Sequence, residues 1–287
     1  MERELWRRLY HLIMEVGETL RLVDVTFQPH IVLLVFFWAA LHDRPVSWAC
    51  EPRNWATTTL RPARLPSTST MSRRLRRVDT AMLMRAVVAR IRREGDETLI
   101  TLIDGKPLTI GGASGDPEAR CGRAAGLLAK GYKLFAVWGG RPAPEAFRVY
   151  PMNKSEIRVA VEMMPDLCGG GYMLGDGEYD ASPVYDAAAA AGYQLLAPRE
   201  HPEAGLGHHY QSPFRLRCIE LLRSSFGQEI YGLRGDIERR YGVLTSFGGG
   251  LSPLPAWVRH QDRAWMWTTA KLVVNAARIL RNKRLAA

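Results

Sequence analysis

Apolar residues follow a helical spacing in the first third of the chain. In the opening segment they recur every three or four positions, at Leu5, Leu9, Leu12, Ile13 and Val16. That spacing marks one face of a helix. A continuous apolar run predicts a buried helix at about 31–42, and further helices are expected from about 71 and over about 80–93. Residues 1–94 are therefore expected to form an all-helical region.

Beyond Gly95 the pattern changes to short apolar stretches that are typical of strands. Strands are predicted at 98–103, 107–110, 132–138, 147–151, 172–175 and 194–197. Helices are predicted at 155–164, 183–191, 213–241 and 264–283. Strands followed by strand–helix alternation indicate an α/β fold, with a mixed β-sheet flanked by helices. Residues 95–287 are expected to form this second domain, which ends in a basic helix.

Positive charge is concentrated at the two ends of the chain. Residues 1–93 carry 16 Arg against 8 acids, a net of +8, and residues 271–287 carry 5 basic residues and no acid. The 18 basic residues and 21 acids between them give a net of −3. Basic ends attract a polyanion by releasing its counterions, so this distribution favours nucleic-acid binding. A solvated basic surface is the alternative interpretation.

Cysteine spacing and the length of the apolar runs argue against a zinc-binding, disulfide-rich or membrane-spanning protein. The cysteines, which include no Cys-x-x-Cys pair, are Cys50, Cys121, Cys168 and Cys218. Their spacing argues against a zinc site or a disulfide framework and fits a reducing cytoplasm. The start of the chain lacks a signal-peptide core, and the apolar run Ile31–Leu41 is too short to cross a bilayer. We therefore expect a cytoplasmic protein that has no membrane partner.

Two acidic residues come directly after apolar strands. Asp104 follows the predicted strand 98–103, and Asp176 follows the predicted strand 172–175. If these strands are neighbours, both carboxylates emerge at one edge of the sheet, where two close negative charges favour a hard cation between them. The commoner alternative is that each Asp serves only the chemistry of its turn.

A third acid is expected from a helix that faces this edge. Tyr231, Arg234 and Glu238 are spaced three and four apart, so they share one helical face. Glu238 can complete a metal site, the planar guanidinium of Arg234 suits a phosphate, and Tyr231 can stack on a sugar or base or donate to a phosphate. An ordinary ion-paired helix surface is the alternative. The acids that compete for the ligand role are Asp116, Glu178, Asp180, Glu229 and Asp236.

Three ordered blocks of sequence surround these acids. They are IDGKPLTIGGASGDPEA with KGYKLFAVW (103–138), LGDGEYDASPVYDAAAAAGYQLLAPR (174–199), and YGLRGDIERRYG with LSPLPAWVRHQDRAWMWTTAKLVVNAAR (231–278). Together they resemble insertion-sequence transposases of the DDE type, whose catalytic domain has an RNase H-like fold. The spacing Tyr231-x2-Arg234-x3-Glu238 is similar to the Y-R-E-K signature of that family. The resemblance covers about residues 95–280 and, less specifically, HDRPVSWACEPRNW in the N-terminal region.

The resemblance implies a reaction, cofactors and partners. Asp104 and Asp176 would be the strand-borne catalytic metal ligands, and Glu238 the helix-borne one. The implied cofactors are two Mg²⁺ or Mn²⁺ ions. The implied reaction is hydrolysis at the transposon end, followed by attack of the freed 3′-hydroxyl on target DNA. The implied partners are double-stranded DNA, both as terminal inverted repeats and as target, and a second copy of the chain in a homodimer on DNA.

The chain departs from the family pattern in two places. The lysine of the signature would fall at position 245, which is Thr245 here, so no lysine contact is expected near the cleaved end. Only 62 positions separate Asp176 from Glu238, too few for the large β insertion that some relatives carry there. The route by which the second DNA strand is released is therefore left open.

Further DNA contacts are predicted outside the acidic site. The Arg-rich stretch within 66–93 predicts a helix-turn-helix element in an N-terminal DNA-binding region, with an Arg-rich linker helix as the alternative. The residues expected to contact DNA there are Arg73, Arg74, Arg76 and Arg77. Lys133 and Arg199 are additional candidates for phosphate contacts.

Two other functions would use the same residues. An RNase H-like metal-dependent nuclease would cut DNA without joining it, and an inactive relative would act as a DNA-binding regulator. The three intact acids argue against the inactive relative. Strand transfer from a DNA end with a free 3′-hydroxyl distinguishes the transposase from the nuclease.

Overall fold

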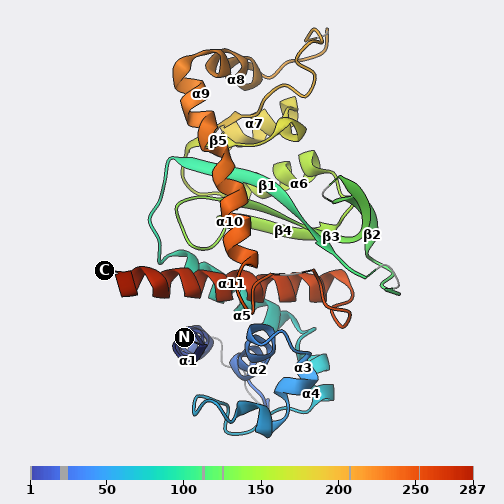
Figure 1. Ribbon diagram of the computed structural model, residues 1–287, viewed down its shortest axis with the longest axis vertical. Helices are drawn as coiled ribbons and strands as arrows, with labels where there is room; N and C mark the ends of the chain where they lie inside the picture. The colour runs from blue at the N-terminus through green and yellow to red at the C-terminus, as the bar shows by residue number, and fades with distance from the viewer. Residues whose placement is uncertain are drawn as a thin grey trace. The chain divides into compact units, whose positions relative to one another are not determined.

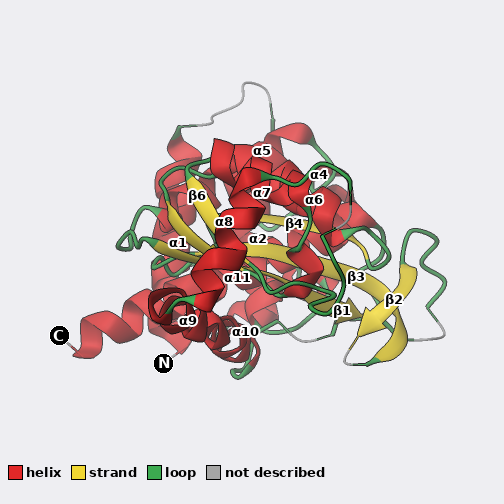
Figure 2. Cartoon of the chain, turned by 90° about the horizontal axis from the view of Figure 1, so that it is seen from above, coloured by secondary structure: helices red, strands yellow, loops and turns green. Residues whose placement is uncertain are grey.

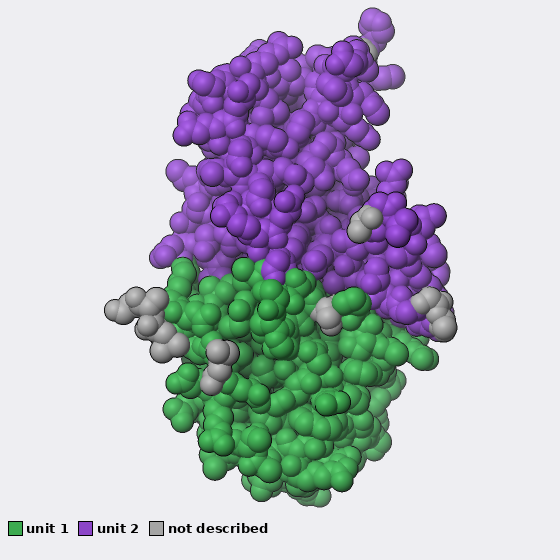
Figure 3. Space-filling model, viewed as in Figure 1, with its two compact units in different colours: residues 1–95, 243–287 green, residues 96–242 purple. Residues whose placement is uncertain are grey.

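The chain packs as two compact units. The computed structural model describes residues 2–19, 25–111, 114–124, 126–206, 208–251 and 253–286. One unit consists of residues 1–95 together with 243–287, and the other of residues 96–242 (Figure 3). The last helix thus belongs to the first packing unit, whereas the sequence analysis grouped it with the second domain, because it packs against N-terminal helices. A functional division into 1–94 and 95–287 stays a prediction.

The first unit is built from helices, as the periodicity of residues 1–94 predicts. Its elements are α1 (Glu2–Glu18), α2 (Pro29–Leu41), α3 (Val46–Ala49), the 3-10 helix η1 (Pro52–Trp55), α4 (Thr68–Arg74), α5 (Val78–Arg92) and α11 (Gln261–Ala286). Contacts join α1, α2, α5 and α11 to one another (Figure 1). Almost every residue of α2 is buried, which explains its unbroken apolar run. Within the described part of the chain, no helix combines the length and the apolar character that a membrane span needs.

Three buried tryptophans, Trp6, Trp38 and Trp55, pack together inside the first unit. The ring centroid of Trp38 lies 4.8 Å from that of each of the other two. Each indole N–H donates to a backbone carbonyl, as a buried indole requires. The acceptors are the carbonyl oxygens of Leu60, Asn54 and Ala49. The cluster therefore fastens the irregular segment around η1 to α1 and α2.

In the described part of the second unit, six strands form a mixed sheet. They are β1 (Ile100–Thr109), β2 (Arg120–Ala124), β3 (Leu127–Trp138), β4 (Ala146–Pro151), β5 (Gly171–Leu174) and β6 (Tyr193–Leu196). The strand order is β2-β3-β1-β5-β6, and β4 also pairs with β3 (Figure 2). β1 is antiparallel to β3 and parallel to β5, which is parallel to β6. The mixed sheet is confirmed, although β1 replaces two predicted strands and β2 was not predicted.

The helices of the second unit flank this sheet. They are α6 (Glu156–Met163), η2 (Met164–Asp166), η3 (Gly177–Tyr179), α7 (Ser182–Ala190), α8 (Pro213–Arg223), α9 (Ser225–Gly232), η4 (Leu233–Gly235) and α10 (Asp236–Thr245). Residues 213–241 are helical, as predicted, but they do not form one continuous helix. Ser224 is extended and caps α9 through its hydroxyl, and position 227 lies so close to the Leu221 carbonyl that only glycine fits. The chain therefore turns between α8 and α9.

A buried lysine links separate segments of the first unit. The side chain of Lys271 in α11 is fully buried, and its ammonium donates to the carboxylate of Asp43. It also donates to the carbonyl oxygens of Ala40 and Gly249, at 2.6 and 3.0 Å. Burial lowers the pKa of Lys271, and the charge of Asp43 opposes that effect. The ion pair thus supports the packing of α11 against the end of α2.

Replacing Asp43 with Asn is expected to destabilise the protein by about 2 kcal/mol, because the buried ammonium loses its compensating charge. Asn tolerates the positive φ of 52° at this position, so the substitution tests charge and not backbone strain. The measurement is the midpoint of urea unfolding. Glu51→Gln is the matched control, since it breaks an ion pair with the exposed Arg53. Equal midpoints for the two variants would contradict the role given to Asp43.

Candidate active site

Two aspartates lie side by side on neighbouring parallel strands. β1 and β5 pair in parallel with Leu102 opposite Leu174. Asp104 and Asp176 each lie two residues further along the chain, so both fall at the same end of the pair. Asp104 lies within β1, opposite Ala136 of β3, because the strand continues past the turn that the sequence indicated. The neighbouring strands on which the metal-site hypothesis depends are therefore present.

Local backbone donors orient both carboxylates. Asp104 Oδ1 accepts a hydrogen bond from the N–H of Gly105 at 2.7 Å. Asp176 caps the 3-10 helix η3, and its Oδ1 accepts from the N–H of Glu178 at 3.0 Å. Each aspartate thus uses one oxygen for a nearby backbone N–H and retains acceptor capacity on the other.

Burial and neighbouring negative charges disfavour ionisation at this site. Burial raises the pKa of Asp104 to about 6, with further increases from Asp176 and Glu156. The Gly105 N–H and the charge of Arg234 oppose this rise in the pKa of Asp104. Burial also raises the pKa of Asp176, again with a contribution from Glu156. Such perturbed, like-charged carboxyls mark a candidate functional site.

Arg234 lies between the second aspartate and the third predicted acid. Its guanidinium nitrogens lie 3.8 Å from Asp176 Oδ2 and 3.9 Å from Glu238 Oε1. The side chain of Glu238 is 72% exposed. The hydroxyl of Tyr231 donates to the carbonyl oxygen of Gly175, at 3.2 Å, beside Asp176. The predicted Tyr–Arg–Glu group thus lies at the aspartates, although η4 interrupts the single helix that was expected to carry it.

A tyrosine in α10 attaches this helix to the strand that bears Asp104. The hydroxyl of Tyr241 donates to the backbone carbonyl oxygen of Asp104 at 2.9 Å. The ring of Tyr241 also packs edge-on against that of Trp138 in β3, with centroids 6.3 Å apart. Because Glu238 precedes Tyr241 by less than one helical turn, this contact keeps Glu238 near the aspartates.

The donor set fits a hard cation in part. Asp104 and Asp176 provide oxygen ligands of the kind that Mg²⁺ and Mn²⁺ prefer, and a cation would relieve their mutual repulsion. Within the described residues, however, no three acidic, histidine or cysteine side chains are arranged to hold a metal ion. The structure therefore assembles two of the three predicted ligands and leaves Glu238 on the other side of Arg234.

Glu156 was not predicted from the sequence, yet its negative charge contributes to the raised pKa of both aspartates. Its carboxylate pairs with Lys133 Nζ at 2.5 Å and accepts from the Tyr179 hydroxyl at 2.9 Å. A hydrogen bond to Glu156 raises the pKa of Glu178 to about 7. A Cβ at position 105 would lie 2.7 Å from Lys133 Cδ, so Gly105 leaves room for this lysine. The available signal was the N-cap Ser155, which places Glu156 in the first turn of a helix.

Lys133 and Arg199 both form ion pairs or hydrogen bonds with other residues of the second unit. Lys133, predicted to contact phosphate, is only 9% exposed and forms the ion pair with Glu156. The guanidinium of Arg199 donates to the backbone carbonyls of Pro202, at 2.9 Å, and Ala204. In this structure both cations serve internal contacts, and a phosphate contact for either stays a prediction.

The predicted arginine cluster lies in α4 and the turn before α5. Arg73, Arg76 and Arg77 are exposed, whereas Arg74 is half-buried. Asp79 pairs with Arg77 at 3.0 Å and with Arg74 at 3.6 Å. Burial raises the pKa of Asp79, but its hydrogen bond with Arg77 and the other contacts outweigh that effect and lower it overall. The cluster belongs to the first unit, whereas the acidic site belongs to the second.

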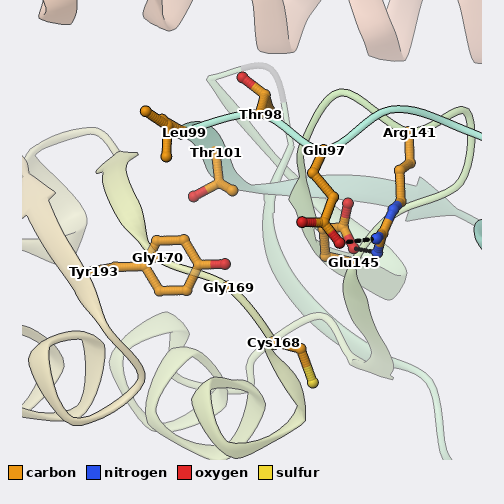
Figure 4. A pocket seen from close by; sticks show the side chains of 10 residues that line it. All are labelled: Glu97, Thr98, Leu99, Thr101, Arg141, Glu145, Cys168, Gly169, Gly170 and Tyr193. Atoms are coloured by element: carbon orange, nitrogen blue, oxygen red, sulfur yellow. Dashed lines mark hydrogen bonds and ion pairs between the residues drawn. The ribbon is translucent and has the colours of Figure 1, made fainter.

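A hollow of about 160 Å³ lies at the opposite end of the parallel strands. Residues at or before the starts of β1, β5 and β6 line it, among them Leu99, Gly170 and Tyr193 (Figure 4). On one side Arg141 pairs with Glu97 and, at 3.0 Å, with Glu145. The aspartates lie toward the carboxyl ends of β1 and β5, where open α/β sheets usually bind ligands. The hollow is therefore separate from the acidic site.

A comparison with protein families decides the class of the protein. The family model described as "Transposase DDE domain" matches residues 95–272. The chain belongs to the DDE transposases. Comparisons with curated proteins and with solved structures found no match.

Membership of the DDE transposases explains the type of sheet and suggests why acids lie on it. The DDE domain implies an RNase H-like fold, and the mixed sheet flanked by helices agrees with it. Enzymes of this family act on DNA and generally use divalent metal ions. The matched region contains Asp104, Asp176 and Glu238, whose individual roles are taken up below.

Replacing Asp104 with Asn is expected to stabilise the metal-free transposase at neutral pH by about 2–3 kcal/mol. The native pKa of Asp104, about 6, exceeds its ordinary value of 3.8, so the charged form costs stability above pH 6. The cost disappears as the pH falls from about 6 toward 3.8, and the difference between parent and variant should shrink with it. Urea unfolding in EDTA across this range measures the effect. The exposed Asp262→Asn is the control, and an unstabilised Asp104→Asn would contradict the burial argument.

Proposed function

We propose that this transposase cleaves the ends of transposon DNA and transfers the freed 3′ ends into target DNA. Asp104, Asp176 and Glu238 are its catalytic residues. The observation that carries the proposal is the parallel register of β1 and β5, which brings Asp104 and Asp176 together as partly buried carboxyls of raised pKa. Partly buried acids held together in a DNA-acting enzyme are suited to holding cations at a phosphate.

The same three residues would hold two Mg²⁺ or Mn²⁺ ions. When bound, such ions activate the attacking hydroxyl and stabilise the leaving oxygen of the phosphodiester. Asp104 and Asp176 supply ligands from the sheet, fixed by the Gly105 and Glu178 N–H groups. Glu238 supplies a ligand from α10, and its exposure leaves it free to change rotamer.

Arg234 has two roles in this proposal. In the metal-free protein its guanidinium partly neutralises Asp176 and Glu238. Its contact distances of 3.8 and 3.9 Å are longer than close ion pairs, so little is lost when it turns to a DNA phosphate. A planar guanidinium binds phosphate through two parallel hydrogen bonds. Tyr231 lies beside it and would contact a sugar, a base or a phosphate.

The N-terminal region supplies DNA affinity in this proposal. Residues 1–93 carry a net charge of +8 in the sequence, and Arg73, Arg76 and Arg77 are exposed. Together with Arg74 they would contact the DNA backbone or the major groove, and Lys133 and Arg199 would join only if their internal contacts opened. A homodimer on DNA would hold both transposon ends before cleavage.

The test uses a plasmid that carries the DNA flanking the reading frame, with Mg²⁺ or Mn²⁺ added. Asp104→Asn, Asp176→Asn and Glu238→Gln should each lower end cleavage by roughly 10³-fold or more, because each weakens a site that supplies several kcal/mol to the transition state. EDTA should abolish cleavage by the parent. Asp262→Asn should cleave like the parent. If the three variants cleaved as well as this control, the assignment of the catalytic residues would be wrong.

A second assay separates joining from cutting. It supplies a precut transposon end with a free 3′-hydroxyl and scores its covalent joining to a target plasmid. Joined product supports the transposase. Cleavage without joining would indicate a nuclease, and binding without either would indicate a DNA-binding regulator.

A further inference from the structure

The β2–β3 hairpin extends the sheet at the edge opposite β6 (Figure 2). Its strands pair with Arg123 opposite Leu128 and Cys121 opposite Lys130. Leu127 and Leu128 at the start of β3 are 75% and 80% exposed. Because successive side chains of a strand point to opposite faces, Leu127 and Leu128 expose apolar surface on the two different faces of the hairpin.

The two faces of this hairpin differ. On one face, a Cβ at Gly122 would lie 2.7 Å from the Met152 carbonyl oxygen, and one at Gly131 would lie 3.0 Å from Met152 Cε. Met152 therefore covers this face. Since side chains alternate along a strand, the other face presents four residues from the two strands. They are Cys121, Arg123, Leu128 and Lys130. This set is called the hairpin face below.

The hairpin face is positive. The hairpin from Arg120 to Gly131 contains no acid, and two of its three cations, Arg123 and Lys130, lie on the hairpin face. Arg123 is exposed, and Lys130 is partly exposed with its Nζ on the Ser114 carbonyl oxygen at 3.0 Å. Two acids precede the hairpin. Asp116 is buried and accepts from the Tyr132 hydroxyl, whereas Glu118 is exposed in the preceding loop. On the hairpin face itself, an exposed leucine thus lies between two cations.

We propose that the hairpin face is a DNA-contacting ribbon of this transposase. A two-stranded ribbon fits the major groove, and cations on it neutralise phosphates. Arg123 and Lys130 contact the DNA backbone, and Leu128 makes apolar contact with base edges in that groove, such as the methyl group of thymine. The proposal rests on DNA being the substrate, and it adds a contact surface distinct from the N-terminal arginines and from Tyr231 and Arg234.

Charge favours DNA over a second copy of the chain as the occupant. Cores of protein–protein interfaces are depleted in charged residues, yet Leu128 is flanked by Arg123 across the strand pair and by Lys130 two residues on. A second copy would also bring the same cations against one another in a symmetric contact. DNA, as a polyanion, would instead attract these cations and would bring no like charges against them.

The experiment measures fluorescence anisotropy of a labelled duplex of arbitrary sequence, about 20 base pairs or roughly two helical turns long, in EDTA so that no cutting occurs. Arg123→Ala should weaken binding by the full chain roughly three- to tenfold and reduce the slope of log K against log salt by about 0.9, the value for one phosphate contact. Leu128→Ala should weaken binding without changing that slope. Both changes lie at exposed positions, and their unfolding midpoints should match the parent.

Matched controls come from the same unit. Arg158→Ala removes an exposed arginine from α6, and Leu99→Ala removes a leucine that is 73% exposed. Both should bind like the parent. If the hairpin variants bind DNA as tightly as the controls, the hairpin proposal is wrong while the proposed function stands. The same conclusion follows if light scattering shows that the hairpin variants no longer dimerise although their DNA affinity is unchanged. An unaltered protein that failed to bind the duplex would overturn both.

Discussion

The parallel pairing of β1 and β5 is the constraint on which the site depends. By setting Leu102 opposite Leu174, it brings two aspartates to one end of neighbouring strands. Burial makes their charges unfavourable, and the charge of Asp176 adds to the cost at Asp104. Placing two aspartates together in this way lowers the stability of the sheet. Such an arrangement is typical of a functional site and not of a structural one.

Two basic residues near the aspartates differ in how tightly they are paired. Lys133 and Glu156 form a close pair at 2.5 Å, so most of the lysine charge is already compensated. Arg234, by contrast, stays nearly 4 Å from both of its carboxylates. The tight pair is suited to fixing strand β3 and helix α6 beside the aspartates. The looser one is suited to exchange partners, which is what binding of a phosphate demands.

Most of the strands, the two aspartates near their ends and the likeness to DDE transposases could be predicted from the sequence, because they follow from local alternation and from motifs. Strand β2 was missed, and β1 was predicted as two shorter strands. Asp104 was expected in a turn, yet β1 runs on because pairing with β3 supplies partners as far as Thr109. The break at Ser224 and the role of Glu156 escaped prediction, since both depend on contacts with residues distant in sequence or across a turn. Glu238 was predicted as a ligand, but the guanidinium of Arg234 lies between it and Asp176, which spacing along the sequence cannot reveal.

A carboxylate-rich centre repels the DNA on which it must act. The middle of the chain, residues 94–270, carries 18 basic residues against 21 acids, so its net charge of −3 offers no general attraction. Affinity must therefore come from local groups of cations, because exposed charges more than a Debye length of about 10 Å away are screened. In the described structure such groups occur on the acid-free β2–β3 hairpin and in the α4–α5 segment. Placement of cations, more than their total, thus determines where a duplex can approach the acids.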